Sequence, residues 1–144
     1  MEKTNDYFRF REFIRLLEVK LGLLSDGEMS CCGVTMTQCH AIVEIGREKD
    51  ISLNKLSDLL NLDNSTMSRT VNNLVNGGLA SRELDPQDRR YVTITLTDEG
   101  SKVFNQIETG MNAYFQNIYT KIPEQKRDQV LESLQLLITI MEQY

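Results

Sequence analysis

The 144-residue sequence has one histidine and lacks the short motifs on which many enzymes depend. It contains no glycine-rich phosphate loop, no H-E-x-x-H and no G-x-S-x-G segment. A histidine-based catalytic dyad would have to use His40, and the neighbouring Cys39 points to a different face of the expected helix. We therefore do not expect an enzyme.

Long apolar runs are missing as well. No segment reaches the roughly 18 apolar residues that cross a membrane, and the opening MEKTNDYF lacks the basic-then-apolar order of a signal peptide. Three cysteines, two of them adjacent, argue against a secreted disulfide framework. The sequence predicts a cytoplasmic protein with no membrane partner, built as one compact domain or as one domain with helical extensions.

An excess of positive charge is also missing. Sixteen Lys and Arg residues stand against 21 Asp and Glu residues, which gives a net charge of −5. Residues 52–91 hold five basic and five acidic residues, so the deficit lies in the rest of the chain. This balance excludes a protein that coats nucleic acid through bulk charge. Attraction for phosphate must come from where individual arginines sit, helped by helix N-termini.

Apolar periodicity and capping residues predict a mostly α fold with a small β-hairpin, in the order α-α-α-α-β-β-α-α. Thr35 and Gln38 have the spacing of a capping box, and Ser52 and Asp63 are expected N-caps of the next two helices. The expected helices are 5–24, 35–49, 52–60, 63–76, one from 97 and one from 123, and the expected strands are 79–84 and 91–96.

The helix expected over residues 63–76 has an unusual polar face. Val71 and Leu74 point toward a core, while the opposite face carries hydroxyls, amides and one guanidinium. Ordinary solvated faces are richer in Glu and Lys, and neither occurs between Asp63 and Gly78. Amides suit adenine, and arginine suits guanine or phosphate. The candidate DNA-binding residues are Asn64, Ser65, Thr66, Ser68, Arg69 and Asn72, with Arg89 and Arg90 on the hairpin that follows.

That hairpin has a basic tip. Asp85 and Asp88 can accept local backbone hydrogen bonds that shape the turn, which leaves Arg89 and Arg90 to project. A narrow minor groove attracts inserted arginines. Alone, the tip would be interpreted as a surface turn whose arginines neutralise its aspartates. Following the polar helix, it indicates a wing that grips DNA.

Four consecutive motifs carry a resemblance to a known family. They are Ser65–Arg69, Gly78–Arg82, Asp85–Arg90 and Leu96–Gly100. In order and spacing they resemble the MarR family of bacterial winged helix-turn-helix regulators. The resemblance implies dimerisation through residues 1–34 and 98–144, around a DNA-binding domain at 35–97.

The resemblance also implies how such a protein works. A homodimer would bind double-stranded DNA at a palindromic operator, with the helix at 63–76 in the major groove and the wing in the minor groove. Arg90 would be the wing residue nearest the minor groove, and Arg89 would contact phosphate or pair with an aspartate. Repression would be relieved by a small ligand or by thiol chemistry.

Cysteines gather around the expected start of the second helix, at Cys31, Cys32 and Cys39. A helix N-terminus lowers the pKa of a thiol, and three sulfurs suit a soft metal or a metalloid. These cysteines are candidates for a sensor of an electrophile, an oxidant or a metalloid effector. Alternatively, Cys39 is a small core residue and the other two are loop residues. Because no C-x-x-C pair with a matching second pair occurs, we do not expect a structural zinc site. We also expect no required cofactor.

A second class of function remains open. Winged helices also serve as protein-interaction modules without sequence-specific DNA binding, and the acidic charge would suit that use. Salt-dependent and sequence-selective binding of duplex DNA distinguishes the two.

Overall fold

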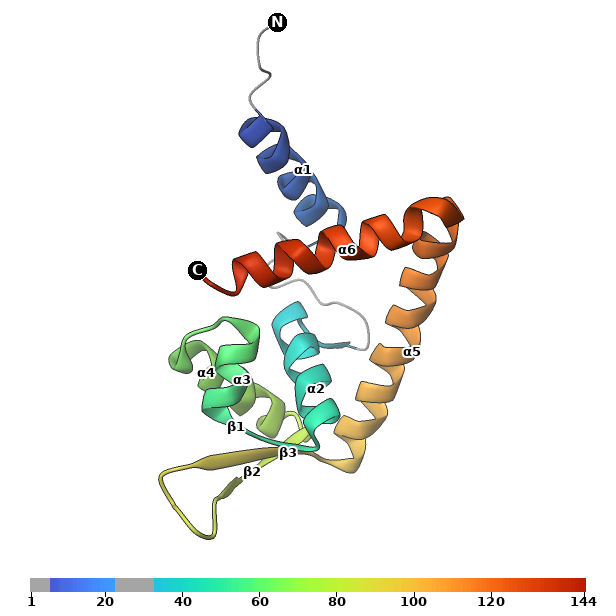
Figure 1. The fold of residues 1–144 in the computed structure, drawn as a ribbon. Helices are drawn as coiled ribbons and strands as arrows, with labels where there is room; N and C mark the ends of the chain where they lie inside the picture. The colour runs from blue at the N-terminus through green and yellow to red at the C-terminus, as the bar shows by residue number, and fades with distance from the viewer. Residues whose placement is uncertain (1–5, 23–32) are drawn as a thin grey trace, which may run out of the picture. The chain divides into compact units, whose positions relative to one another are not determined.

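The computed structural model describes residues 6–22 and 33–144 (Figure 1). Over these residues it divides into two compact units, which separate after Ile107. The elements, in chain order, are α1 (Asp6–Lys20), α2 (Met36–Glu48), β1 (Asp50–Ser52), α3 (Leu53–Leu60), α4 (Asn64–Asn76), β2 (Ala80–Leu84), β3 (Val92–Leu96), α5 (Asp98–Lys121) and α6 (Glu124–Met141).

The predicted N-caps are confirmed. Thr35 and Gln38 form a complete capping box at the start of α2, with bonds of 3.2 and 3.0 Å. Ser52 and Asp63 each accept a bond from the backbone N–H three residues on, at 3.1 and 3.0 Å. These side chains satisfy N–H groups that a helix start leaves without partners. Each helix of the first unit from α2 to α4 therefore begins at a residue dictated by local chemistry.

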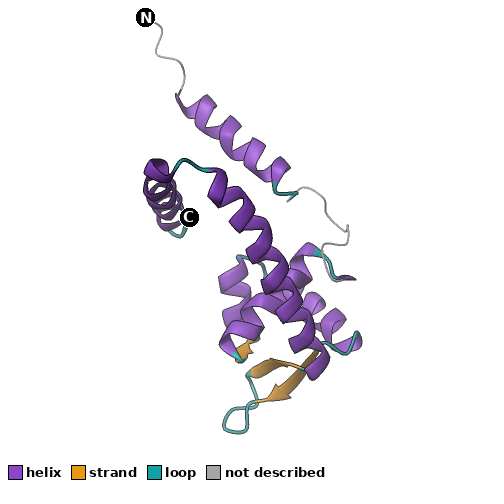
Figure 2. Cartoon of the chain, turned by 90° about the vertical axis from the view of Figure 1, so that its right-hand side faces the viewer, coloured by secondary structure: helices purple, strands orange, loops and turns teal. Residues whose placement is uncertain are grey.

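The sheet has one strand more than the sequence predicted. β1 pairs antiparallel with β3, with Ile51 opposite Ile94, and β2 pairs with the other side of β3. Three residues are too few to show the alternation by which strands are recognised. β1 forms because β3 offers it an open edge, and that edge exists only in the folded chain. Figure 2 shows the strands of this sheet in orange.

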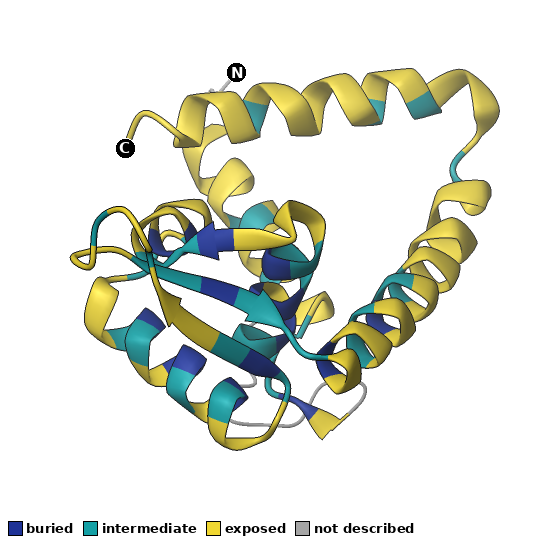
Figure 3. Ribbon diagram, turned by 90° about the horizontal axis from the view of Figure 1, so that it is seen from below, coloured by how far each residue is buried: buried dark blue, intermediate teal, exposed yellow. Residues whose placement is uncertain are grey.

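The core of the first unit lies where α2, α3, α4 and the sheet meet. Its largest fully buried side chains include Ile42, Leu56, Met67, Leu74 and Ile94. In Figure 3 the dark blue segments mark such buried residues on these elements. The burial of Met67 and Leu74 determines which face of α4 is left for other partners.

The end of α4 and the start of α5 are joined through the first residues of the hairpin. Gly78 has φ +76°, a left-handed conformation that glycine adopts without steric cost, and the chain reverses there into β2. The hydroxyl of Thr97 donates to the Gly78 carbonyl at 2.6 Å and accepts from the Gly100 N–H at 3.0 Å. A Cβ built at Gly100 would stand 1.9 Å from the carbonyl oxygen of Leu79. Only glycine allows this close contact between α5 and the base of the hairpin.

The second unit contains the later part of α5 and α6. Arg127 fastens the turn between them, because its guanidinium donates to the carbonyls of Ile122 and Thr120 at 3.0 and 3.1 Å. α6 begins at Glu124, one residue after Pro123, and buries none of its residues. Across the described parts of the chain, no helix combines the length and apolarity needed to cross a membrane.

Candidate nucleic-acid interface

One face of α4 is polar, accessible and free of carboxylates. Its centre, opposite the buried Met67 and Leu74, is formed by Ser65, Arg69 and Asn72. Among the candidates on this helix, Asn64, Ser65 and Arg69 are exposed, while Thr66, Ser68 and Asn72 are half-buried. The side chains that the sequence singled out thus lie on one helix, on or beside one face.

Thr66 is committed to the start of the helix. Its hydroxyl donates to the Asp63 carboxylate at 2.6 Å, and its backbone N–H donates to the other carboxylate oxygen at 3.0 Å. These two bonds, the hydroxyl bond first, lower the pKa of Asp63. Because the hydroxyl proton of Thr66 is already donated, it is not available to a phosphate oxygen. Thr66 therefore contributes mainly by fixing the N-terminus of α4.

Asn72 has a partner that sequence reasoning did not assign. The guanidinium of Arg82, on β2, donates from Nη1 to the amide oxygen of Asn72. Ten residues separate the two, and no spacing rule for helices or strands links positions across that distance. The bond forms because the turn after Asn76 brings β2 back along α4.

The tip of the wing (residues 80–96) is shaped by its two aspartates. Asp85 accepts a bond from the Gln87 N–H at 2.8 Å. Asp88 holds Arg90 by two bonds, Nη2 to Oδ2 at 2.7 Å and Nε to Oδ1 at 3.0 Å. The Arg90 guanidinium lowers the pKa of Asp88. The backbone bonds of the turn are as the sequence suggested, but Arg90 pairs with Asp88 where the sequence led us to expect a projecting side chain.

The two wing arginines differ in their surroundings. Arg90, which the resemblance places nearest the minor groove, is the one bound to an aspartate. Arg89 is exposed and makes no ion pair with any residue that the structure describes. The side chain of Arg90 is 85% exposed in this pair. Exposed ion pairs contribute little and are screened by salt, so this pair can give way to a phosphate.

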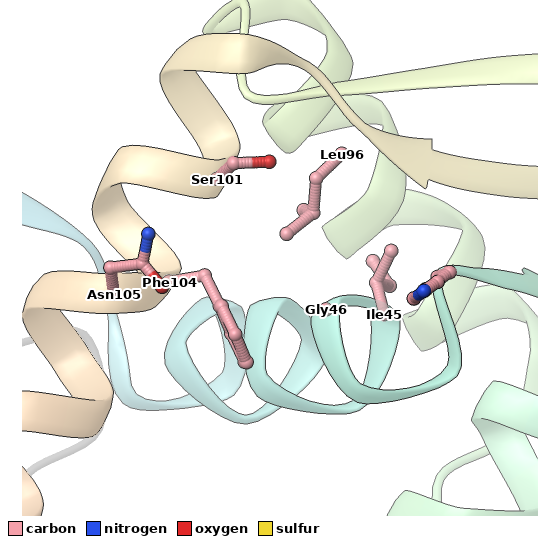
Figure 4. Close-up of a pocket in the computed structure, with 7 residues that line it drawn as sticks. Ile45, Gly46, Leu96, Ser101, Phe104 and Asn105 are labelled. Carbon is pink, nitrogen blue, oxygen red and sulfur yellow. The ribbon is translucent and has the colours of Figure 1, made fainter.

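A pocket of about 290 Å³ lies between the end of α2, the end of β3 and the first turns of α5 (Figure 4). Its apolar wall includes Ile45 and Phe104. Gly46 makes room for the Phe104 ring, because a Cβ at position 46 would lie 2.4 Å from a carbon of that ring. Its polar lining is Lys49, Ser101 and Asn105. Lys49 has φ 69°, an uncommon conformation for a residue with a side chain.

The described cysteine is a core residue. Cys39 is 2% exposed on α2, in the same core as Ile42 and Ile45. Cys31 and Cys32 lie outside the described residues. Within the described ranges, no three His, Cys, Asp or Glu side chains come close enough to share a metal ion. The structure therefore supports the core interpretation for Cys39.

The segment that contains the polar helix and most of the wing is similar to known proteins. Residues 33–90, which include the polar helix and most of the wing, match the model of the MarR family. This segment of the chain resembles the MarR family. It is 24% identical to the HTH-type transcriptional regulator BilQ of Clostridium symbiosum (strain WAL-14163) over 139 residues, which are 95% of this chain and 92% of that protein.

Two solved structures have the same fold. Streptococcus pneumoniae FabT in complex with DNA aligns with a TM-score of 0.81 at 22% identity, over 95% of this chain and 98% of FabT. A mutant of E. coli MarR, complexed with operator DNA, aligns with a TM-score of 0.77 at 20% identity, over 95% of this chain and 99% of that one. These likenesses establish the winged helix-turn-helix fold of this chain.

Proposed function

We propose that this protein is a sequence-specific, double-stranded-DNA-binding regulator of transcription that acts as a homodimer, and that it represses. The observation that carries the proposal is the carboxylate-free face of α4, whose only charge is Arg69, within the same compact unit as the wing that carries Arg89 and Arg90. An α-helix fits the major groove, and its amides and guanidinium match base edges. Because the protein would bind genomic DNA, the cytoplasm is the proposed compartment.

The wing supplies the second contact. Arg89, which has no competing carboxylate among the described residues, is proposed to bind phosphate or the minor-groove edge. Arg90 would bind DNA as well once its ion pair with Asp88 breaks. FabT and the MarR mutant, with which the chain shares its fold, are both solved with DNA.

The first prediction concerns salt. The affinity for duplex DNA taken from upstream of the protein's own gene should fall steeply with salt, because bound cations on DNA are released when arginines replace them. Arg89→Gln should lower the slope of log K against log salt by about one. Lys102→Gln is the matched control, since Lys102 lies on α5 and pairs with Glu99 at 3.1 Å. Fluorescence anisotropy measures both. Equal binding to every sequence, or none to any, would favour the protein-interaction module instead.

The second prediction concerns the bridge at the wing tip. Asp88→Asn keeps the oxygen that accepts from the Arg90 backbone N–H at 3.1 Å, but releases the guanidinium. We expect tighter DNA binding, by a few-fold at low salt, with the gain fading as salt is raised. Asp85→Asn removes the same charge from the same turn without touching an arginine, and should gain less. Equal gains in the two variants would mean that only net charge matters there.

The homodimer is proposed from apolar surface that the single chain leaves uncovered. α1 and α6 bury none of their residues. On α6, Leu131, Leu134 and Ile138 recur at helical spacing and are 50%, 45% and 52% exposed. A stripe of this kind marks a protein interface. A second copy is the occupant that fits, because a palindromic operator requires two reading helices related by a two-fold axis.

The third prediction tests that assembly. Light scattering after size exclusion should give twice the 16.6 kDa of one chain. Leu134→Glu should shift the protein toward monomer and weaken DNA binding at least tenfold, because a charge would be buried in the interface. Gln129→Glu adds the same charge on another face of α6 and should change neither. A wild-type monomer that still binds its operator tightly would contradict the dimer.

Release is proposed to follow from a small ligand in the pocket at the end of α2. Its apolar wall and its single lysine suit a compact apolar molecule with an anionic group. The pocket is lined by Leu96 at the end of β3 and by the start of α5, the elements that support the wing. A ligand there can therefore alter the geometry of the wing.

The fourth prediction separates this route from thiol chemistry. An aromatic carboxylate should weaken DNA binding, and Lys49→Gln should raise the concentration needed by about tenfold without changing affinity for DNA itself. Release by arsenite, copper or thiol reagents but not by acids would assign sensing to Cys31 and Cys32. The double variant Cys31→Ser, Cys32→Ser is the check on that outcome, because it leaves the buried Cys39 in place.

A further inference from the structure

The side-chain bond between Arg82 and Asn72 joins β2 to the exposed face of α4. Asn72 is half-buried and lies on the face that we propose to read DNA, whereas Arg82 lies on the wing. The connection between them is short, because only residues 77–79 separate α4 from β2. Within it, the N–H of Leu79 donates to the Leu74 carbonyl at 2.9 Å, and that of Gly78 to the Val75 carbonyl at 3.0 Å. The two side chains are thus held together by a rigid turn.

The chemistry of the pair fixes the orientation of the amide. A guanidinium has five N–H donors and no acceptor, so the asparagine atom that faces it must be the oxygen. The choice between the two ends of an amide is ordinarily ambiguous, but it is not ambiguous beside an arginine. Asn72 therefore directs its oxygen to Arg82 and keeps its NH₂ group for other partners.

This orientation changes what Asn72 can recognise. An asparagine reads adenine by using both ends of its amide, accepting from the N6 amino group and donating to N7. The oxygen of Asn72 is engaged by a cation, which occupies the space beside it and polarises the amide toward donation. The partners that remain are acceptors, namely N7 and O6 of guanine, N7 of adenine, O4 of thymine and phosphate oxygens. Adenine thereby loses one of its two bonds to the amide, whereas guanine keeps two acceptors.

We propose that Arg82 is a positioning residue that makes Asn72 a hydrogen-bond donor in the interface, so that Asn72 favours guanine, whose edge offers two acceptors, over adenine, which offers only N7. The inference rests on the proposed function and adds a specificity rule to it. Arg82 acts through Asn72 and need not touch DNA.

The test is a double-mutant cycle read out as base preference. Affinities of the full-length wild-type protein, Arg82→Met, Asn72→Ala and the double variant are measured against a panel of operators in which each position is changed to every base. We expect Arg82→Met to move the preference at one operator position toward adenine by about fivefold or more, because the freed amide can then pair with adenine. Asn72→Ala should abolish the preference at that same position, and adding Arg82→Met to it should change nothing further there. Arg82→Lys keeps a donor and should stay near the wild-type preference.

Each outcome has a separate meaning. An Arg82→Met effect that persists in the Asn72→Ala background would overturn the inference, since Arg82 would then contact DNA directly. A uniform loss across all bases would overturn it as well, because such a loss reports phosphate contact or weakened folding. Urea unfolding of the same variants identifies the folding case. A wild-type protein that discriminates among no operators would instead refute the proposed function.

Discussion

The close contact between the backbone of Leu79 and Gly100 is the constraint on which the rest of the first unit depends. It is possible only because Gly100 has no side chain to meet the Leu79 carbonyl. The same carbonyl accepts the Thr97 N–H at 3.0 Å, and Thr97 in turn binds the Gly78 carbonyl. The end of α4, the base of the wing and the start of α5 are therefore one rigid junction. In the proposed DNA complex, such a junction would hold α4 and the wing in a fixed relation to neighbouring grooves.

The acidic residues near the interface have structural roles that limit their electrostatic cost. Asp63 caps α4, Asp85 shapes the wing turn and Asp88 holds Arg90. Each is bound to donors from its own neighbourhood, and the pKa values of Asp63 and Asp88 are lowered by those bonds. Although the protein has a net charge of −5, residues 52–91, which include α4 and the wing tip, carry no net charge. In the proposed complex, positioned arginines would supply the attraction for DNA, and the acidic remainder would oppose binding to arbitrary sequences.

Some features of the site could not be read from the chain. β1 was missed because three residues carry no periodic signal, and it exists only against the edge of β3. The partner of Asn72 was missed because Arg82 is ten residues away on another element. The pairing of Asp88 with Arg90 was not predicted, because the resemblance offered Arg89 as the partner of an aspartate. In each case the deciding contact is between groups that local sequence rules do not connect.

The amino-acid sequence by itself determined the helix starts at Thr35, Ser52 and Asp63, the stop at Gly78 and the polar face of α4, because each depends on a few consecutive residues. The tertiary structure alone decided which polar groups on that face and on the wing are left to bind a partner. It commits the hydroxyl of Thr66 and the amide oxygen of Asn72, and leaves Arg89 without a carboxylate among the described residues. A polar group forms hydrogen bonds with partners that lie within about 3 Å of it. The fold, and not the order of residues in the sequence, decides which groups lie that close.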